Sequence, residues 1–500
     1  MKKLPTSKVH FIGMGGIGMS AVAQLMMAQG ARVTGSDSSD NALLRRIRAM
    51  GGKVFLGHGS RNLNHPDLVV YSSAIMPQNP ELIAARNRGI PVLHRGQLLA
   101  RLVAGRRTIA VAGSHGKSTT AALAGQLLLQ AGMDPTLALG AEVEALGGNA
   151  RMGQGRYAVV EADESDCSFL WLQPTVAILT NIDDEHLDYF RNRSEIEEAY
   201  AAFAERIVPQ GTLVGCADDP SVRRLLSRSS RRRLSYGLSK LAEMRAMEIL
   251  LEAGRIRYRC VRAGRTLGSV RLQIPGLHNV LNSLGVVAVA EMLGIPFRTT
   301  QAVLEEYRGA KRRFQVHAEV QGVMVVEDYG HHPAEIQATL QAARSWPGRR
   351  IRCLFQPHRY SRTHFLLDRF ASSFNQADEV LLLSIYAASE EPVEGVTANA
   401  LYRALREGGH KKVRFCSSAQ QALDHLQKGS RPGDMVLFLG AGSVGKLAGQ
   451  FVQRLKDRPS GCGDRRPLVG RSAPLGRGFA ERPASSGVLG ARGRTSEHTW

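Results

Sequence analysis

A lysine and three hydroxyl residues open an expected helix in the segment RTIAVAGSHGKSTT, residues 107–120. A glycine turn that enters a helix points backbone N–H groups and the positive end of the helix dipole at an anion. Lys117 can neutralise β- and γ-phosphate charge, and Ser118 can ligate Mg²⁺. Val111 replaces the first glycine of the common phosphate-loop pattern, but Gly-Lys-Ser remains. We therefore expect ATP phosphates at Gly113, Ser114, His115, Gly116, Lys117, Ser118 and Thr119.

Acidic residues follow the next apolar run, YAVVEADES, at Glu161, Asp163, Glu164 and Asp166. We expect Glu161 to bind Mg²⁺, because a metal that bridges phosphates uses few protein carboxylates and keeps several waters. A solvated acidic loop is the alternative. The run TVAILTNIDDEHLDYF then brings His186 to the same edge, either as a ligand of a second metal, as a group that orients a nucleophile, or as a structural histidine.

Histidines and arginines follow two further strand-like runs near the C-terminal end of the chain. EDYGHHPAEI contains Asp328, Tyr329, His331 and His332, and QPHRYSRTHF contains His358, Arg359 and Arg362. Two arginines three residues apart on a helical turn share a face and can bind a carboxylate, although surface arginine pairs are also common. The paired histidines lack the spacing of a zinc motif.

Three more stretches could also bind part of a nucleotide. Gly13–Gly18 (GMGGIG) has a dinucleotide-like pattern, and Asp37 after the second expected strand suits a ribose hydroxyl, but a packing turn explains these glycines equally well. Gly440–Lys446 has GxxxxGK spacing, yet Leu447 offers no hydroxyl to a metal, so we interpret it as a structural turn. GLHNVLNS opens a helix with His278 and two asparagines that suit contacts with adenine.

Strand, glycine turn and helix follow one another at residues 8–30, 107–132 and 434–455. This order is typical of doubly wound α/β sheets, in which ligands bind beyond the carboxyl ends of the strands. Further apolar runs predict buried parallel strands, whereas residues 211–273 predict short alternating strands. We expect domains at 1–105, 106–309 and 310–456, and a disordered Gly-, Pro-, Ser- and Arg-rich tail at 457–500.

The composition is that of a globular protein, with 43% hydrophobic and 22% charged residues. The sequence has no apolar run of the roughly 18 residues needed to span a bilayer and no signal-peptide pattern at its start. These features predict a cytoplasmic protein without a membrane partner. The six cysteines are far apart and are expected to be reduced.

The formal net charge of +21 is the feature that would favour binding to a nucleic acid. Only 12 of the 65 basic residues are lysines, and the arginines are spread along the chain without interleaved aromatic residues. We therefore expect small polyanionic ligands and no nucleic acid.

Taken together, the motifs resemble those of the Mur ligases. SHGKSTT, EADESDCSFLWLQP, TNIDDEHLDYF, GLHNVLNS, KRRFQ, EDYGHHPAE, QPHRYSRT and GAGSVGK occur in the family's order between about residues 8 and 456. GMGGIGMSAVA, DYGHHP and QPHRYSR resemble the alanine-adding members in particular. Ser114 and Ser118 stand where threonine is usual, SIYAASEEP departs from the family pattern, and the tail has no counterpart.

The resemblance implies a fold and an activity. The fold is α/β, with a Rossmann-like N-terminal domain for a UDP-sugar, a P-loop ATPase-like central domain and a Rossmann-like C-terminal domain. The activity is ATP-dependent ligation of L-alanine to the lactyl carboxylate of UDP-N-acetylmuramate through an acyl phosphate, in peptidoglycan precursor synthesis. The first glycine loop would then bind a UDP diphosphate rather than NAD.

Residue roles follow from the same resemblance. Ser118 and Glu161 would bind one Mg²⁺, and Glu161 with His186 a second. ATP would contact His278, Asn279, Asn282, Arg313 and Asp328 besides the phosphate loop. The UDP-sugar would contact Gly15, Gly16, Ile17, Gly18, Asp37, Ser72 and Ser73. L-Alanine would contact Tyr329, His331, Arg359 and Arg362. The catalytic set is Lys117, Glu161, His186 and His331, with His331 as a candidate acceptor of the amine proton.

Three other functions compete with this interpretation. A nicotinamide oxidoreductase would use the first glycine loop and Asp37, but it has no need of Gly-Lys-Ser. A basic nucleic-acid-binding protein would bind duplexes in a salt-dependent manner. A ligase that recycles a tripeptide would differ only in the acceptor pocket. The sequence is compatible with a monomer or a weak dimer.

Overall fold

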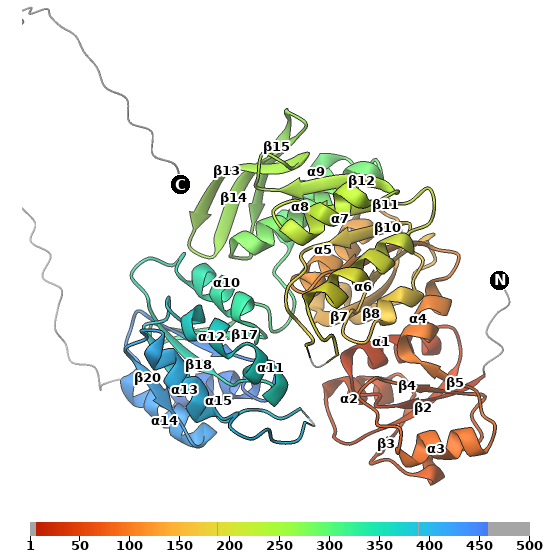
Figure 1. The fold of residues 1–500 in the computed structure, drawn as a ribbon, viewed down its shortest axis with the longest axis horizontal. Helices are drawn as coiled ribbons and strands as arrows, with labels where there is room; N and C mark the ends of the chain where they lie inside the picture. Colours follow the sequence, from red (N-terminus) through yellow and green to blue (C-terminus); the bar gives the residue numbers. More distant parts are fainter. Residues whose placement is uncertain (1–6, 188, 389, 459–500) are drawn as a thin grey trace, which may run out of the picture. The chain divides into compact units, whose positions relative to one another are not determined.

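The computed structural model describes residues 7–187, 189–388 and 390–458, which form three β-sheets flanked by helices (Figure 1). The expected disordered tail lies outside the described residues from residue 459 onward, as does Cys462. The α/β prediction is confirmed. The domain boundaries near residues 105 and 309 stay predictions.

The first sheet is parallel and has the order β3-β2-β1-β4-β5. Its strands are β1 (Lys8–Ile12), β2 (Arg32–Asp37), β3 (Lys53–Leu56), β4 (Leu68–Tyr71) and β5 (Val92–His94). Its helices are α1 (Ile17–Ala28), α2 (Ala42–Ala49), η1 (Ser60–Asn62), α3 (Pro80–Asn87) and α4 (Arg95–Val103). The strand order reverses between β1 and β4, so the crevice beside the end of β1 is where such a sheet binds ligands.

The second sheet has the order β15-β14-β13-β12-β11-β10-β6-β9-β7-β8. Its strands are β6 (Arg107–Ala112), β7 (Thr136–Val143), β8 (Gly148–Arg151), β9 (Tyr157–Glu161), β10 (Val176–Leu179), β11 (Thr212–Cys216), β12 (Arg232–Gly237), β13 (Met244–Glu252), β14 (Arg255–Arg262) and β15 (Arg265–Leu272). The strands from β12 to β7 are parallel, whereas β13, β14 and β15 pair antiparallel. Residues 211–273, where short alternating strands were expected, thus also contain the parallel strands β11 and β12.

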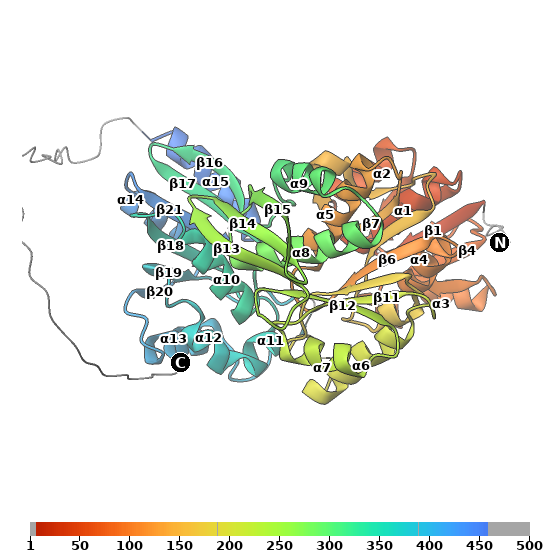
Figure 2. The ribbon, with the colours of Figure 1, turned by 90° about the horizontal axis from the view of Figure 1, so that it is seen from above.

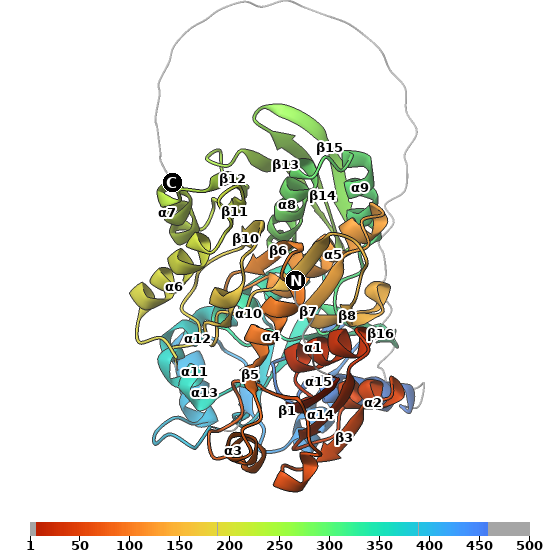
Figure 3. The ribbon, with the colours of Figure 1, turned by 90° about the vertical axis from the view of Figure 1, so that its right-hand side faces the viewer.

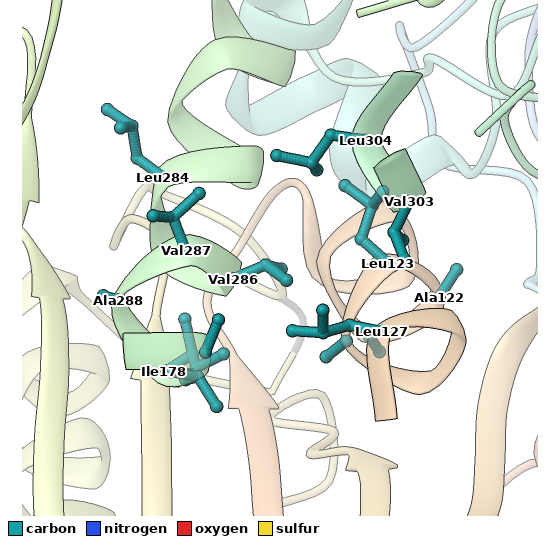
Figure 4. Packing of buried hydrophobic residues seen from close by; sticks show 14 of the residues in the cluster. Ala122, Leu123, Leu127, Ile178, Leu284, Val286, Val287, Ala288, Val303 and Leu304 are labelled. Carbon is teal, nitrogen blue, oxygen red and sulfur yellow. The ribbon is translucent and has the colours of Figure 1, made fainter. Parts of the chain in front are cut away.

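Helices cover both faces of this sheet, and three of them build its largest core. The helical segments are α5 (Lys117–Gln130), η2 (Glu144–Leu146), η3 (Ser168–Trp171), α6 (Arg193–Glu205), α7 (Pro220–Arg228), α8 (Leu277–Met292) and α9 (Phe297–Glu306). Leu123 and Leu127 of α5 pack with Val286 of α8 and Val303 of α9 (Figure 4). This apolar packing fixes the starts of α5 and α8, which carry expected site residues.

The third sheet has the order β16-β17-β21-β18-β19-β20 (Figure 2). Its strands are β16 (Gln315–Val320), β17 (Val323–Asp328), β18 (Arg350–Phe355), β19 (Glu379–Leu382), β20 (Val413–Phe415) and β21 (Asp434–Leu439). Its helices are α10 (Pro333–Ala343), α11 (Tyr360–Phe365), α12 (Leu367–Ser373), α13 (Ala398–Glu407), α14 (Ala419–Gly429) and α15 (Gly445–Lys456). Alternating strand residues pack against α10, α12 and α13 on one face and against α14 and α15 on the other.

Helix α1 joins the first sheet to the second by packing against β7 and β8 (Figure 3). The buried Asn149 amide donates hydrogen bonds to the Ile17 carbonyl at 2.8 Å and the Ser20 hydroxyl at 3.1 Å. The loop before α1 is thereby held at the edge of the central sheet.

Two further observations concern the cysteines and the helices of the described residues. Cys167, Cys216, Cys260, Cys353 and Cys416 are free thiols. Within the described part of the chain, the helices all fall short of the length or apolarity that a membrane crossing would need.

Candidate active site

Two cavities share part of their lining at the carboxyl ends of the central and C-terminal strands. The larger has a volume of about 670 Å³ and is lined by loops of all three sheets. The smaller has a volume of about 240 Å³ and lies between the start of α5, the start of α8 and α10. Ser118, Arg313 and Glu335 line both, so they mark the junction of the two cavities.

The loop between β6 and α5 is shaped by residues that follow β10. Gly113 has φ +132°, and a side chain there would collide with Thr180 and the backbone of Asn181. Asn181 accepts a hydrogen bond from the backbone N–H of His115 at 2.8 Å and donates one to its carbonyl at 3.0 Å. Gly116 caps α5 in the left-handed region at φ +85°. The N–H groups at this helix start therefore face the junction as a preformed anion site.

Lys117 lies against the acids that follow β9. Its Nζ donates to the carbonyl of Gly113 at 2.6 Å and to Glu164 Oε1 at 2.7 Å. Burial acts to lower the pKa of Lys117, but Glu164 and Glu161 outweigh it and raise this pKa. Lys117 is therefore a permanent cation beside the helix start.

Ser118 and Glu161 form a donor pair suited to Mg²⁺. Ser118 Oγ donates to Glu161 Oε1 at 3.2 Å, and Glu161 Oε2 accepts the N–H of Gly140 at 2.8 Å. Burial raises the pKa of Glu161 in spite of Lys117. Glu164, whose side chain is 2% exposed, has an Oε2 atom without a hydrogen-bond partner in the structure. A desolvated carboxylate beside a carboxylate oxygen that accepts no hydrogen bond fits a hard cation such as Mg²⁺.

His186 lies at the same edge but faces a different acid from the one expected. Its Nε2 is 3.6 Å from Glu164 Oε1, and its backbone is in the left-handed region at φ +55°. Burial acts to lower the pKa of His186, but Glu164 raises it. A metal at this imidazole has to compete with a proton, because only the neutral ring is a ligand. The proposed pairing of Glu161 and His186 on a second metal stays a prediction.

The smaller cavity contains the residues expected to contact the nucleotide. His115, Gly116, Ser118, Thr119, His278, Asn279, Asn282, Arg313 and Asp328 line it. Burial and the neighbouring Arg313 lower the pKa of His278 to about 4, so this ring is neutral. Neutral imidazole and amide groups among apolar side chains suit the face and edge of a purine.

Asp328 is used mainly by its own loop. Its carboxylate accepts the N–H groups of Phe314 and Gly330, both at 2.7 Å, and the Thr339 hydroxyl at 3.2 Å. These bonds position the segment that carries Tyr329 and His331.

His331 is a neutral imidazole on the wall of the larger cavity. Burial and Arg362 lower its pKa to about 4. Its Nδ1 lies 3.0 Å from the carbonyl oxygen of Tyr329, which can only accept, so Nδ1 carries the hydrogen and Nε2 keeps the lone pair. Nε2 is 4.0 Å from Glu185. The Tyr329 ring lies under the guanidinium groups of Arg312 and Arg313.

The two arginines line the larger cavity in different ways. Arg362 lies within α11, is 9% exposed and pairs with Glu185 at 3.1 Å. Arg359 precedes the helix with φ +71° and lies 3.7 Å from Glu390. The expectation that both share a helical face is therefore wrong, because the chain turns through the left-handed region before α11 begins. The loop still brings both side chains to one cavity.

The first glycine loop lies at the opposite end of the larger cavity. Gly16, Ile17, Gly18, Ser72 and Ser73 line it. Gly15 and Asp37 are outside that lining. Asp37 accepts the N–H of Gly15 at 2.8 Å, so its carboxylate holds the loop instead of facing the cavity.

Sequence reasoning missed several charged residues of the larger cavity, including Arg95, Glu185 and Glu335. Arg95 lies between the first glycine loop and Asp163, to which it donates at 2.9 Å. It directly follows β5, so the strand-end rule applied elsewhere would have found it. The indications of Glu185 and Glu335 in the sequence were weaker. Glu335 could have been found from its spacing after His332, which is that of a capping box.

The phosphate loop also contacts the C-terminal segment directly. His115 Nε2 is 3.2 Å from Asp183, and its Nδ1 is 3.4 Å from Glu335. Burial acts to lower the pKa of His115, but these two carboxylates raise it to about 9. Although His115, Glu185 and His332 bring potential ligand atoms within 4.8 Å of one another, a protonated His115 does not suit a metal.

The third glycine loop has a structural role. Gly440 and Gly442 accept hydrogen bonds from Arg312 Nη2 through their carbonyls. Neither of the two cavities includes residues 440–446 in its lining. The interpretation of this GxxxxGK stretch as a turn agrees with that geometry.

Family models match most of the chain. The N-terminal segment matches "Mur ligase family, catalytic domain" over residues 8–107. The central segment matches "Mur ligase middle domain" over residues 111–290. The third match is "Mur ligase, glutamate ligase domain" over residues 312–442.

Individual relatives give the same result. The UDP-N-acetylmuramate–L-alanine ligase of Pelotomaculum thermopropionicum is 44% identical over 454 residues, covering 90% of this chain and 98% of that protein. The enzyme of the same name from Myxococcus xanthus is 44% identical, covering 91% and 96%. The crystal structure of the UDP-N-acetylmuramate-alanine ligase of Thermotoga maritima is similar with a TM-score of 0.77 at 29% identity, covering 90% and 99%. A murein peptide ligase from Psychrobacter arcticus shares the fold at 23% identity and a TM-score of 0.68.

Proposed function

The chain belongs to the Mur ligase family, and from this premise we propose that it joins L-alanine to the lactyl carboxylate of UDP-N-acetylmuramate with ATP as the energy source. The supporting observation is the junction of the two cavities. Lys117 at the start of α5, His331 and Arg362 all line the larger cavity. Ser118 beside Lys117 lines both cavities. An anion site and a carboxylate site thus open onto one space.

The first chemical step activates the carboxylate. A lactyl carboxylate oxygen attacks the γ-phosphorus of ATP, the bond to the β-phosphate oxygen breaks, and ADP leaves as the acyl phosphate forms. In this step Lys117 and the N–H groups at the start of α5 would stabilise the negative charge that spreads over the transferring group; their support is the cation and the glycine cap at this helix start. Preformed positive charge of this kind is the main catalytic contribution in phosphoryl transfer.

The second step forms the amide. The neutral alanine amine attacks the acyl carbon, and inorganic phosphate leaves with the electrons of the C–O bond. The free Nε2 lone pair of His331 accepts the amine proton, and Glu185 at 4.0 Å stabilises the imidazolium that results. Arg359 and Arg362 bind the alanine carboxylate, and Tyr329 lines the same wall.

Mg²⁺ is the metal that the oxygen donors of this site fit. Ser118 and Glu161 would hold one ion, and Glu161 with His186 would hold a second once the imidazole is neutral. A bound Mg²⁺ would neutralise phosphate charge. Removing it with EDTA should therefore abolish turnover, and adding Mg²⁺ back should restore it.

The UDP-sugar occupies the far end of the larger cavity. The start of α1 and the residues Gly16, Ile17, Gly18, Ser72 and Ser73 bind the diphosphate and its neighbouring groups, while Asp37 supports the loop from behind. Because ATP and UDP-sugars are cytoplasmic metabolites, we propose that the enzyme works in the cytoplasm.

Phosphate release from ATP and Mg²⁺ in the presence of UDP-N-acetylmuramate tests the proposal. L-alanine, glycine, L-serine and the recycling tripeptide are added separately, and the product is identified by mass. We expect release that requires the UDP-sugar and is fastest with L-alanine. If phosphate were released with the tripeptide but not with L-alanine, the protein would be a recycling ligase instead.

A further inference from the structure

Glu335 lies at the junction of the two cavities, although no role follows for it from the chemistry above. It is the third residue of α10, its side chain is 13% exposed, and it lines both cavities. The same helix begins directly after the Tyr329–His332 segment. A carboxylate in this place contacts both halves of the site.

One oxygen of Glu335 faces the nucleotide half. Oε1 is 3.4 Å from His115 Nδ1 of the phosphate loop and 3.6 Å from Arg313 Nη1. His115 and Arg313 are both cations in a buried region, and two cations without an anion between them repel each other strongly at low dielectric. The carboxylate of Glu335 neutralises this repulsion.

The other oxygen of Glu335 faces the alanine half. Oε2 accepts the backbone N–H of His331 at 3.0 Å and that of His332 at 3.3 Å. These bonds fix the backbone that aims the His331 ring at the larger cavity. His332 in turn caps α10, so a capping box is formed at the same time.

We propose that Glu335 is a positioning residue that couples the two half-sites, with its charge holding His115 and Arg313 in place for ATP while its second oxygen fixes His331 for the amine. This inference rests on the proposed ligase function and adds to it the group that connects phosphate transfer with amine attack.

The test is Glu335→Gln, because glutamine also serves at this capping position and removes only the charge. We expect a modestly lower melting temperature, because the repulsion between His115 and Arg313 is no longer neutralised, in a protein that stays folded at the assay temperature. Binding of a non-hydrolysable ATP analogue should weaken by about 10- to 100-fold, and kcat should fall by a similar factor. The KM for UDP-N-acetylmuramate should stay within about twofold. In NMR titrations of labelled histidine, the pKa of His115 should fall from its value of about 9.

Glu195→Gln is the matched control. Glu195 is the third residue of α6 and accepts the N–H of Arg191 at 3.0 Å, away from both cavities. This variant should behave as the wild type in every measurement. A double-mutant cycle with His115→Gln tests the coupling. In the His115→Gln background, Glu335→Gln should reduce analogue affinity by less than it does in the wild type, because one of the two cations is already gone.

A Glu335→Gln enzyme with unchanged analogue affinity, kcat and His115 pKa would overturn the inference. If analogue affinity and kcat fell in Glu335→Ala but not in Glu335→Gln, the inference would also be overturned, because Glu335 would then act only as a helix cap. Analogue binding and NMR titration need no acceptor substrate, so they report on Glu335 even if the alanine assay refutes the ligase function.

Discussion

In the proposed mechanism, Lys117 is the side chain expected to contribute most to phosphoryl transfer. Lys117→Ala removes the cation at the start of α5 and takes positive charge away from Glu164 and Glu161. We expect kcat to fall by about 10²–10³-fold or more. Phosphate release at saturating substrates measures this, and a near-normal rate would remove the loop from the chemistry.

Lys446 provides the matched control for this prediction. It follows a glycine in the third loop at the same GK spacing, but that loop lines neither cavity. Lys446→Ala should therefore keep the wild-type rate. An equal loss in both variants would point to a general effect of removing a lysine.

Arg359 is expected to act on alanine and not on ATP. Arg359→Ala removes a charged hydrogen-bond donor to the alanine carboxylate, an interaction of about 1.5–3 kcal/mol. The KM for L-alanine should rise by about 10- to 100-fold, while the KM for ATP changes less than about twofold. Initial rates with each substrate varied in turn give both constants, and parallel increases would contradict the assignment.

At the scale of the element, the first glycine loop depends on the end of β2. Asp37→Ala deletes the acceptor of the Gly15 N–H, so the start of α1 loses part of its preorganised shape. The KM for UDP-N-acetylmuramate should rise by about tenfold, with the KM for ATP unchanged.

Asp40→Ala controls for the loss of an acid from the same loop. In the part of the chain that the structure describes, Asp40 pairs with Arg45 and Arg48 at an exposed surface, where such pairs contribute little. Its KM values should match those of the wild type. If Asp40→Ala raised the KM for the UDP-sugar as much as Asp37→Ala does, the effect would be one of charge and not of loop geometry.

At the scale of the whole molecule, four histidines with restricted solvent access, of which His332 is fully buried, make stability depend on pH. Burial is the largest cause that lowers the pKa of His278, His331 and His332 to about 4 and of His358 to about 3. In the unfolded chain these rings take up protons below about pH 6.5. Between the folded pKa values and the unfolded value of about 6.5, protons bind preferentially to the unfolded chain. The free energy of unfolding should therefore fall as the pH falls from about 6.5 to 5.

Other groups modify this slope in a predictable direction. Raised pKa values of Glu161 and Asp328, both caused mainly by burial, oppose the trend, but the four histidines outnumber them. The raised pKa values of His115 and His186 also oppose the trend near pH 6.5, where the unfolded rings are only about half protonated, and this opposition fades as the unfolded rings become fully protonated toward pH 5. Urea unfolding at several pH values measures the slope. His358→Asn should flatten it by about 1.4 kcal/mol per pH unit, and a slope of zero in the wild type would refute the prediction.

Local patterns were sufficient to predict much of this molecule. The strand, glycine turn and helix around Lys117 depend on consecutive residues, and so do the parallel strands that end at Glu161 and Asp328. The same holds for the third glycine loop, where Leu447 alone argued against a nucleotide site. Backbone conformation and strand formation are governed largely by neighbouring residues and by burial pattern, so a single sequence carries them.

Only the tertiary structure decided which charges meet. Lys117 contacts Glu164 across 47 positions, Arg362 pairs with Glu185 across 177, and Asp37 turns toward Gly15 instead of the cavity. The left-handed backbone conformation of Arg359 likewise could not be predicted from the three-residue spacing of Arg359 and Arg362. Contacts of this kind depend on strand order and on how the loops of different sheets converge. The sequence alone therefore determined which chemical groups are present and which loops carry them, and the packing of the sheets decided their partners.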